Sequence, residues 1–462
     1  MISMGQMNED LLRDGVAYAD QWVSYQQERR ELPGVVVAIQ HDDTLLLCKG
    51  YGHADLERQI PMTPEHIFRI ASHSKMFTAT AIMQLVEAGK LRLDDPLADC
   101  IPWLRDQSGL TRVTIRQALN HTTGIVRNGD DADYWQLDQP FPDDEELRRL
   151  VEHGGVVLDA NTSFKYSNIA YALLGIVIEA ASGEPYNAYV TRHIIKPLGL
   201  DDTGPDTDAD CRARLATGYT ARWFGLPHRP LPDVTTGALA SATGFYSTAA
   251  DLCRYAAGHF FGNETLLSDA AKREMQQPYW EVAQTDMHYG LGFAIHEIGG
   301  RRFVGHGGGF PGHATMTLFD PSDRLVVVAL TNEVSGPAGM LAHGILTTIA
   351  FALQQKSATE GSASARERFA GRFANIWGVT DVAAFGDALV SLHPESDDPV
   401  KLVTKLAVED ERTLRATETN GMAAPGEAVR YVRDATGHVA KVIMGGTSAY
   451  PVAIYRERHI GG

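Results

Sequence analysis

Long apolar stretches are missing from this chain of 462 residues, and basic residues are scarce in it. No run of about 18 apolar residues occurs, so we expect no membrane-spanning helix. Residues 1–12 contain no basic segment followed by an apolar one, so we expect no secretory leader. The 41 Lys and Arg residues against 58 Asp and Glu residues give a formal net charge of −17. Nucleic acids and anionic membranes attract basic patches, so this charge argues against both as partners.

Cysteine is also rare. The four cysteines, Cys48, Cys100, Cys211 and Cys253, lie far apart, and no two of them form a C-x-x-C pair. We therefore expect reduced, partly buried thiols, with no metal site and no redox role. Reduced thiols and the missing leader together favour a cytoplasmic protein, and no sequence pattern indicates a cofactor.

Several common catalytic signatures are absent as well. No serine stands in a G-x-S-x-G sequence, which excludes the nucleophile turn of α/β-hydrolases. His296-Glu297 does not continue as H-E-x-x-H, which excludes the corresponding zinc helix. No Walker A sequence occurs, so a P-loop is not expected.

The order of the expected elements predicts the fold class. A helix is expected over 9–30, two strands over 35–49, a largely helical middle, further strands between 291 and 331, and an apolar helix over 339–353. This order predicts an α+β fold, in which one antiparallel sheet is built from both ends of the domain and a helical lobe is inserted.

The length of the chain favours two domains. We expect a first domain over 1–355, a polar linker of low complexity over 356–366, and a second domain over 367–462. Short extended stretches follow one another at even spacing in the last segment, which predicts a small β-barrel.

A serine and a lysine at the expected start of a helix form an S-x-x-K sequence, Ser72-His73-Ser74-Lys75. Residues three apart on a helix share a face, so the Lys75 amine could take the proton of the Ser72 hydroxyl. Backbone N–H groups at a helix start could stabilise the oxyanion that forms. Taken alone, the pattern is more typical of an N-cap serine and a solvated lysine.

Two further motifs stand at element boundaries. Tyr166-x-Asn168 precedes an apolar helix, where the phenol could move a proton and the amide could hold Lys75 or a substrate carbonyl. His306-Gly307-Gly308-Gly309 is expected to end a strand, where glycines let a substrate approach the backbone. A core tyrosine with a helix cap, and a hairpin bulge with a surface histidine, are the alternatives.

The three motifs occur in one order, and together they identify a family. The chain resembles the serine β-lactamase and penicillin-binding-protein-like hydrolases, especially the branch with class C β-lactamases, D-aminopeptidases and esterases. The resemblance covers about residues 35–353 and takes in stretches that flank the motifs, among them Phe68-Arg69-Ile70-Ala71, Asn120-His121-Thr122-Thr123-Gly124 and Tyr289-Gly290-Leu291-Gly292-Phe293. It implies that Ser72 is the acylated nucleophile, Lys75 its activating partner, Tyr166 the acid or base, and Asn168 a positioning residue.

The third motif departs from true β-lactamases, which carry Lys-Thr-Gly on this strand. The resemblance implies that His306, Gly308 and Gly309 position the substrate or hold the oxyanion, with the N–H groups of Gly309 and Ser72 as donors. A neutral histidine cannot replace the lysine as a carboxylate anchor, so we expect weak or no β-lactamase activity and doubt carboxypeptidase activity.

We therefore expect a serine hydrolase that cleaves peptide or amide bonds through an acyl-serine intermediate, with a small peptide or ester as its substrate. A carboxylesterase on the same machinery is one alternative, and a non-catalytic binding or scaffold protein is another. The last domain resembles the lipocalin-like barrel of some related peptidases, and could shape access to the site, build a homo-oligomer or only add stability. The carboxylates of Asp130, Asp131 and Asp133 could hold a peptide's amino terminus, or form a solvated charged run.

Overall fold

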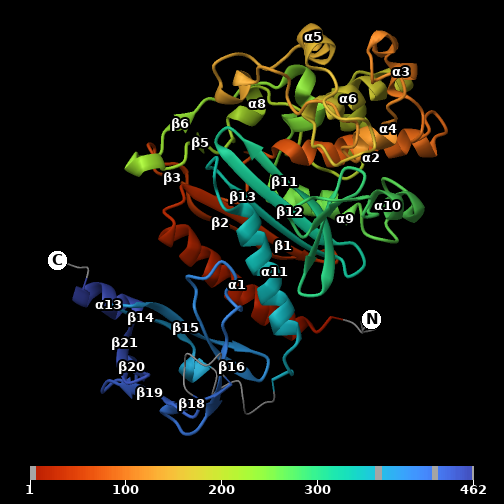
Figure 1. The fold of residues 1–462 in the computed structure, drawn as a ribbon. Helices are drawn as coiled ribbons and strands as arrows, with labels where there is room; N and C mark the ends of the chain where they lie inside the picture. Colours follow the sequence, from red (N-terminus) through yellow and green to blue (C-terminus); the bar gives the residue numbers. More distant parts are fainter. Residues whose placement is uncertain (1–6, 359–366, 419–424, 460–462) are drawn as a thin grey trace. The chain divides into compact units, whose positions relative to one another are not determined.

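A computed structural model describes residues 7–358, 367–418 and 425–459 (Figure 1). Contacts within the chain divide it into two units, residues 31–342 and residues 1–30 together with 343–462. The expected linker over 356–366 falls mainly on residues 359–366, which lie outside the described residues. The domain boundaries at 355 and 367 therefore stay a prediction.

The first unit contains an antiparallel sheet of nine strands. The strands are β1 (Gly34–His41), β2 (Thr44–Asp55), β3 (Ile60–Pro61), β8 (Trp280–Glu281), β9 (Met287–Tyr289), β10 (Ala294–Ile298), β11 (Arg301–Phe310), β12 (His313–Asp320) and β13 (Leu325–Thr331). Their order is β3-β2-β1-β13-β12-β11-β10-β9-β8. The pairing of β1 with β13 joins the two ends of the domain, as the sequence predicts.

The helices of this unit come from the segment between β3 and β8. They are α2 (Ser74–Glu87), α3 (Leu97–Cys100), α4 (Ile115–Leu119), α5 (Asp144–Gly154), α6 (Asn168–Ser182), α7 (Tyr186–Val190), α8 (Ala209–Arg212), α9 (Ala249–Ala257) and α10 (Asp269–Met275). Two short strand pairs accompany them, β4 (Phe68–Arg69) with β7 (Tyr246–Ser247), and β5 (Gly218–Tyr219) with β6 (Pro230–Leu231). Helices α3 to α6 gather on one side of the sheet, at the top of Figure 1.

Local sequence explains where the helices of the lobe begin and end. The Thr114 side chain and Gln117 form a capping box at the start of α4. The Ser167 hydroxyl accepts the N–H of Ala170 and caps α6, which ends at Gly183 with φ +77°. These ends hold two segments that carry the candidate site.

Two strand ends and one loop differ from the expectations. Strand β2 was expected to end at Lys49, but it continues through Gly50 to Asp55. A side chain at Gly50 would clash with the Met62 backbone, so glycine lets the two segments approach closely there. The glycine motif His306–Gly309 lies inside β11, because this strand continues for one residue beyond Gly309 and ends at Phe310. The segment 130–142 is acidic and aromatic without a regular period, a pattern that predicts a surface loop, but it buries Tyr134 and Phe141 in the core.

The second unit contains a closed barrel, which confirms the predicted barrel. Its strands are β14 (Gly371–Asn375), β15 (Gly378–Phe385), β16 (Ala388–Leu392), β17 (Thr404–Val408), β18 (Thr413–Glu418), β19 (Ala428–Arg433), β20 (Val439–Met444) and β21 (Thr447–Pro451). The helices α1 (Glu9–Arg29) and α13 (Val452–His459) also belong to it, and α11 (Ala338–Leu353) begins in one unit and ends in the other. The pattern of residues 450–455 predicts an extended stretch, which is wrong beyond Pro451, because α13 begins at Val452.

Candidate active site

Ser72 lies in a tight 3₁₀ turn, Ala71–His73, directly before α2. The residue before it, Ala71, has a left-handed backbone with φ +47°, a conformation that costs energy for alanine. Ser72 is partly exposed, whereas His73 and Ser74 are buried and bonded elsewhere. The Ser74 hydroxyl donates to the Ala71 carbonyl, and the His73 ring contacts the Ile70 carbonyl. Of the polar side chains in this turn, Ser72 is thus the one that stays accessible.

Lys75 is fully buried and has three neighbours for its Nζ atom. The Asn168 Oδ1 atom lies at 2.7 Å, the Ala242 carbonyl oxygen at 2.8 Å and the Ser72 Oγ atom at 3.2 Å. Burial, followed by the nearby charge of Arg127, holds the pKa of Lys75 well below its usual range. A neutral amine has two N–H donors and one lone pair. The two carbonyl oxygens can accept both donors, which leaves the lone pair for Ser72.

Tyr166 contacts Ser72 from the other side. Its hydroxyl donates to Ser72 Oγ at 2.8 Å. Burial raises the pKa of Tyr166 above its ordinary value, although the Ser72 bond and Arg127 act against this rise. The phenol therefore keeps its proton at neutral pH.

A buried histidine fixes the ring of Tyr166. The His121 ring lies 4.2 Å from the Tyr166 ring, measured between centroids, and its Nδ1 atom accepts the N–H of Ser167 at 3.1 Å. Burial, followed by the charge of Lys75, keeps the pKa of His121 well below its usual range. In the described part of the chain His121 packs against Tyr166 and has no hydrogen bond to Ser72, so we expect it to hold the Tyr166 ring in place.

Asn168 is the first residue of α6 and joins two polar neighbours. Its Oδ1 atom accepts from Lys75, and its Nδ2 atom donates to the Asn128 Oδ1 atom at 2.7 Å. The bond to Asn128 fixes the orientation of the amide, so that oxygen rather than nitrogen faces the lysine. The structure thus links the four residues in one chain of hydrogen bonds, which runs from Tyr166 through Ser72 and Lys75 to Asn168.

The third motif lies beside this centre. His306 does not contact Ser72; its Nε2 atom meets the Tyr289 hydroxyl at 3.0 Å and its Nδ1 atom meets the Gly307 carbonyl at 2.6 Å. Burial, and next the charge of Lys75, hold the pKa of His306 well below its usual range, so the ring is neutral. These contacts lie within the sheet, and the positioning of the substrate by His306 stays a prediction.

The two later glycines of the motif differ in their surroundings. A Cβ atom at Gly308 would lie 2.2 Å from the Ile70 carbonyl oxygen, so glycine lets β11 pack against the turn that holds Ser72. Gly309 is exposed, and a Cβ atom there would meet nothing within 4 Å. The structure therefore gives Gly308 a packing contact and leaves space beside Gly309.

The sequence matches the protein-family model described as Beta-lactamase over residues 19–348. The chain belongs to the β-lactamase family. "Penicillin-binding protein 4" of Amycolatopsis lactamdurans is 29% identical over 321 residues, which cover 65% of this chain and 81% of that protein. The fold of the first unit is thus the β-lactamase-like fold that the sequence resemblance implies.

Solved structures agree with the fold of this β-lactamase-family chain. The octameric penicillin-binding protein homologue from Pyrococcus abyssi superposes with a TM-score of 0.65 at 24% identity, over 94% of this chain and 99% of that one. A D-stereospecific amidohydrolase from Streptomyces sp. superposes with a TM-score of 0.62 at 22% identity, over 71% of this chain and 96% of that one. At these identities the likeness concerns the fold.

Three neighbours of this β-lactamase-family site escaped the sequence analysis. The Ala242 carbonyl is a backbone group in a turn-rich stretch, and no side chain announces it. Arg127 and Asn128 follow the stretch around His121 closely, so their proximity to that motif was the available signal. Arg127 lies over the Tyr166 ring, with its Cζ atom 5.4 Å from the ring centroid.

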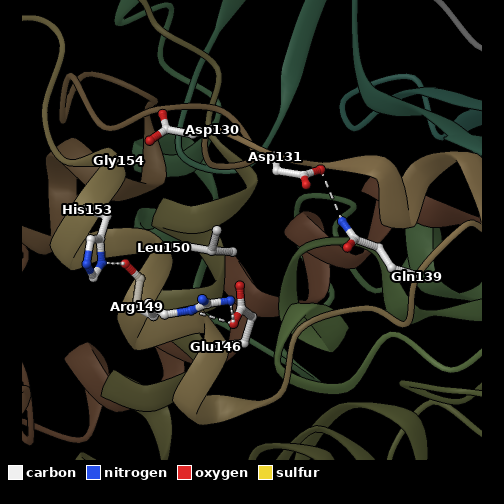
Figure 2. Close-up of a pocket in the computed structure, with 8 residues that line it drawn as sticks. All are labelled: Asp130, Asp131, Gln139, Glu146, Arg149, Leu150, His153 and Gly154. Carbon is white, nitrogen blue, oxygen red and sulfur yellow. Dashed lines mark hydrogen bonds and ion pairs between the residues drawn. The ribbon is translucent and has the colours of Figure 1, made fainter.

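The acidic loop contributes to a separate pocket, shown in Figure 2. This pocket has a volume of about 290 Å³ and is lined by Asp130, Asp131, Gln139, Glu146, Arg149, Leu150, His153 and Gly154. Asp131 accepts a hydrogen bond from Gln139 at 3.2 Å. Ser72, Lys75 and Tyr166 are not among the residues that line this pocket. Asp133 does not line it either and begins a 3₁₀ turn. These contacts do not bring the acidic run to Ser72.

The remaining expectations concern the cysteines, metal binding and membrane-spanning helices. The four cysteines are free thiols, and Cys211 and Cys253 are buried. Within the described ranges, no three His, Cys, Asp or Glu side chains gather in a way that could hold a metal ion. No helix within those ranges combines the length and the apolar character needed to cross a bilayer.

Proposed function

We propose that this protein is a serine hydrolase that cleaves peptide or amide bonds through an acyl-serine intermediate. One observation carries the proposal. The partly exposed Ser72 hydroxyl lies between a buried lysine amine at 3.2 Å and a partly buried phenol at 2.8 Å. A nucleophile held between a base and an acid is the arrangement that acyl transfer requires.

In the proposed reaction, Lys75 acts as the base. Its neutral amine takes the proton of Ser72, and the Ser72 oxygen attacks the carbonyl carbon of the substrate. Tyr166 delivers a proton to the leaving nitrogen as the C–N bond breaks. Water then adds to the acyl-serine ester, which releases the acid and restores the Ser72 hydroxyl.

The oxyanion is proposed to bind to backbone N–H groups of Ser72 and Gly309. Strand β10 pairs with β11 only as far as Gly305, so the following residues of β11 have no described strand partner on that edge. In an antiparallel pair, alternate N–H groups point away from the partner strand. The open space beside Gly309 suits a substrate carbonyl at this edge.

A carboxylesterase is the second candidate, and the neutral His306 favours it. True β-lactamases carry a cation at the corresponding position, whereas burial keeps the His306 ring uncharged. Uncharged acyl esters need no cation there. The names of two similar proteins, a penicillin-binding protein and an amidohydrolase, favour amide bonds. We therefore keep peptide or amide cleavage first and expect weak or no β-lactamase activity.

Labelling of Ser72 tests the shared chemistry. We expect a fluorophosphonate to add one phosphonyl group to the intact protein, measured by mass spectrometry, and Ser72→Ala to abolish the addition. Ser74→Ala is the matched control, because Ser74 is buried and bonded, and it should still be labelled. No addition, or one that survives Ser72→Ala, would favour a non-catalytic scaffold.

A substrate panel separates the two hydrolase candidates. Purified protein is assayed on p-nitrophenyl esters and on D- and L-aminoacyl anilides, with Ser72→Ala as the blank. Turnover of anilides supports the peptidase or amidase. Turnover of esters alone would replace that proposal with the carboxylesterase.

We also propose a cytoplasmic homo-oligomer. The free thiols fit a reducing compartment, and the Pyrococcus abyssi homologue is described as octameric. That structure covers the barrel as well as the β-lactamase-family unit, which makes the barrel a candidate assembly element. Light scattering of the full chain and of a variant that ends at residue 355 would test this role.

A further inference from the structure

The end of β11 carries one of the two N–H groups that are proposed to bind the oxyanion, yet it has few side chains to hold it. Gly307, Gly308 and Gly309 follow one another there. Pairing with β12 holds one edge of this glycine run. Glycine allows the backbone more conformations than other residues do, and it has no side chain that packs. The direction of the Gly309 N–H therefore depends on the residues that flank the run.

Phe310 follows the glycine run directly and is buried, with 2% of its surface exposed. The guanidinium of Arg69 lies against its ring, with the Cζ atom 4.2 Å from the ring centroid. The Phe141 ring stacks on it at 6.0 Å between centroids, with an interplanar angle of 14°, and the Trp135 ring meets it edge-on at 6.1 Å. Side chains from two other segments thus fix the Phe310 ring.

Arg69 is itself held in place. Its side chain is fully buried, and its Nη1 atom contacts Asp233 at 3.2 Å, Asp206 at 3.4 Å and the Thr207 hydroxyl at 2.9 Å. Among the described residues, its Nε and Nη2 atoms have no hydrogen-bond partner. A cation that is removed from water gains most from an aromatic face. The Phe310 ring is therefore a favourable partner for the rest of the guanidinium.

Arg69 also belongs to the segment that carries the other proposed N–H donor. It ends β4, just before the 3₁₀ turn that holds Ser72. The contact between Arg69 and Phe310 thus joins the segments of both donors. It lies next to a second close approach, that of the Ile70 carbonyl to Gly308.

We propose that Phe310 is a positioning residue of the reaction, and that its contact with Arg69 sets the distance between the N–H groups of Ser72 and Gly309. The inference rests on the proposed function, in which both groups hold the oxyanion. Two donors stabilise the developing charge only when both point at the same oxygen. Because a displacement of about 1 Å can cost about 100-fold in rate, loosening Phe310 should slow bond formation more than it weakens binding.

The other end of β11 carries the same kinds of side chain. The Arg301 guanidinium lies 5.9 Å from the centroid of the Phe303 ring, and it pairs with Asp320 at 3.3 Å and with Asp323. Phe303 is buried to the same degree as Phe310, with 2% of its surface exposed. The two phenylalanines are about 23 Å apart along the strand. A change of Phe303 therefore reproduces the loss of packing far from the proposed oxyanion site.

Labelling kinetics on the full chain test the role of Phe310. The probe is a fluorophosphonate. The Ser72 oxygen bonds to phosphorus, fluoride leaves and the Ser72 proton passes to Lys75, while negative charge grows on the phosphoryl oxygen. We expect Phe310→Leu to lower the maximal labelling rate by about 10- to 100-fold and to leave the half-saturating probe concentration nearly unchanged. Phe310→Tyr keeps the ring face and should restore most of the rate.

Phe303→Leu is the matched control. It should lower the melting temperature about as much as Phe310→Leu does and still be labelled at the wild-type rate. Equal slowing in both variants would mean that loss of packing, not the position of the N–H groups, sets the rate, and it overturns the assignment. If Phe310→Leu is too unstable, Phe310→Met takes its place, because methionine fills irregular space without a ring face.

The same experiment separates this proposal from the proposed function. A wild-type protein that is labelled at Ser72, together with a folded Phe310→Leu variant that is labelled equally fast, overturns the role of Phe310 alone. A wild-type protein that is not labelled at all removes the proposed function, and the assignment of Phe310 falls with it.

Discussion

Helix α2 carries two polar clusters that contain the same kinds of side chain. The Ser72 cluster, at the start of the helix, consists of Ser72, Lys75, Tyr166 and Asn168. The Thr80 cluster, further along, consists of Thr80, Tyr255 and His259, together with Lys272, whose charge acts on His259 without a hydrogen bond to it. In the second cluster the Thr80 hydroxyl meets the Tyr255 hydroxyl at 2.9 Å and the His259 Nε2 atom at 3.2 Å. Hydroxyl, lysine and tyrosine therefore do not make a reactive centre by themselves.

The two hydroxyls differ in access. Thr80 is fully buried and donates to the Met76 carbonyl at 2.9 Å, so its proton is already bound. Ser72 is partly exposed and receives the Tyr166 proton. A substrate can therefore reach the Ser72 oxygen but not the Thr80 oxygen.

The two lysines differ in their counter-charge. Lys272 is fully buried, and its amine contacts Asp269 at 3.2 Å and the Phe260 carbonyl at 2.9 Å. Lys75 is as deeply buried, but in the described chain its polar contacts are two carbonyl oxygens and the Ser72 hydroxyl. Burial of a cation is costly without a partner, and the pKa of Lys75 accordingly lies well below its usual range. The lack of a carboxylate beside Lys75, among the residues described, supports its proposed role as the base.

Replacing each lysine should give opposite results. Lys75→Met is expected to lower kcat/KM by about 10³-fold or more without lowering the melting temperature, since it removes a base and an unpaired buried amine. Lys272→Met should lower the free energy of unfolding by about 1–3 kcal/mol through lost hydrogen bonds, with kcat/KM nearly unchanged. Steady-state kinetics and thermal unfolding measure the two effects. Similar losses of activity in both variants would remove the distinction between the clusters.

The two tyrosines offer a matched pair of smaller effect. Tyr166→Phe removes the proposed acid and should lower kcat/KM by about 10²- to 10³-fold with little change in stability. Tyr255→Phe removes a buried hydroxyl at Thr80 and should cost about 1 kcal/mol of stability, with activity kept. If Tyr166→Phe hydrolyses amides at the wild-type rate, the phenol is not the acid.

A carboxylate beside Lys75 would make the first cluster resemble the second. Asn168→Asp is nearly isosteric and places a negative charge where an oxygen now lies 2.7 Å from the amine. This should raise the pKa of Lys75, against the lowering by Arg127, and keep the amine protonated at neutral pH. We expect about a 10²-fold lower kcat/KM at pH 7.

The pH profile reports the same change. Activity requires neutral Lys75, so the wild-type rate falls as pH drops through the lowered pKa of Lys75, and in Asn168→Asp this fall should begin at higher pH. Of the other groups near the amine, Arg127 stays charged and the buried His306 stays neutral. Asn128→Asp, with the charge one residue further away, is the control and should shift the profile less. An unshifted profile in Asn168→Asp would show that Lys75 does not set the acid limb.

The sequence predicted the sheet better than the site. Long apolar strands such as β1 and β13 are buried along nearly their whole length, and their pattern is easily read. Strands β8 and β9 are too short to show alternation. Strand β15 is hard to predict from the sequence, because Asp381 interrupts its apolar pattern. In the folded barrel unit this carboxylate is paired with Arg372 at 2.7 Å, a contact that the sequence pattern does not reveal.

Spacing placed Ser72 and Lys75 on one face, but it could not supply all the partners of the lysine. The Ala242 carbonyl is a backbone atom from a distant turn, and tertiary packing alone brings it to the amine. Whether the Arg127 guanidinium forms an ion pair also depends on which acidic side chains the fold brings close to it. The sequence therefore indicates which residues are candidates, whereas the folded chain decides which of them lack a counter-charge.

His259 in the Thr80 cluster is expected to affect stability rather than activity. Burial, followed by the charge of Lys272, lowers the pKa of His259 to about 3. Below pH about 6.5 the unfolded chain takes up a proton at this histidine and the folded chain does not, so stability falls from pH 6.5 toward 3. Between pH 7 and 5 this group should account for about 2 kcal/mol of that fall.

His259→Gln should therefore reduce the difference in unfolding free energy between pH 7 and pH 5 by about 2 kcal/mol. The remaining difference comes from other buried histidines, among them His73, whose pKa burial lowers to about 4. Urea unfolding at both pH values measures it, and His153→Gln on the exposed face of α5 serves as the control. Activity at pH 7 should not change, because no reacting group is touched. If His259→Gln instead alters the acid limb of kcat/KM, the Thr80 cluster is coupled to the reaction and the two clusters are not separate.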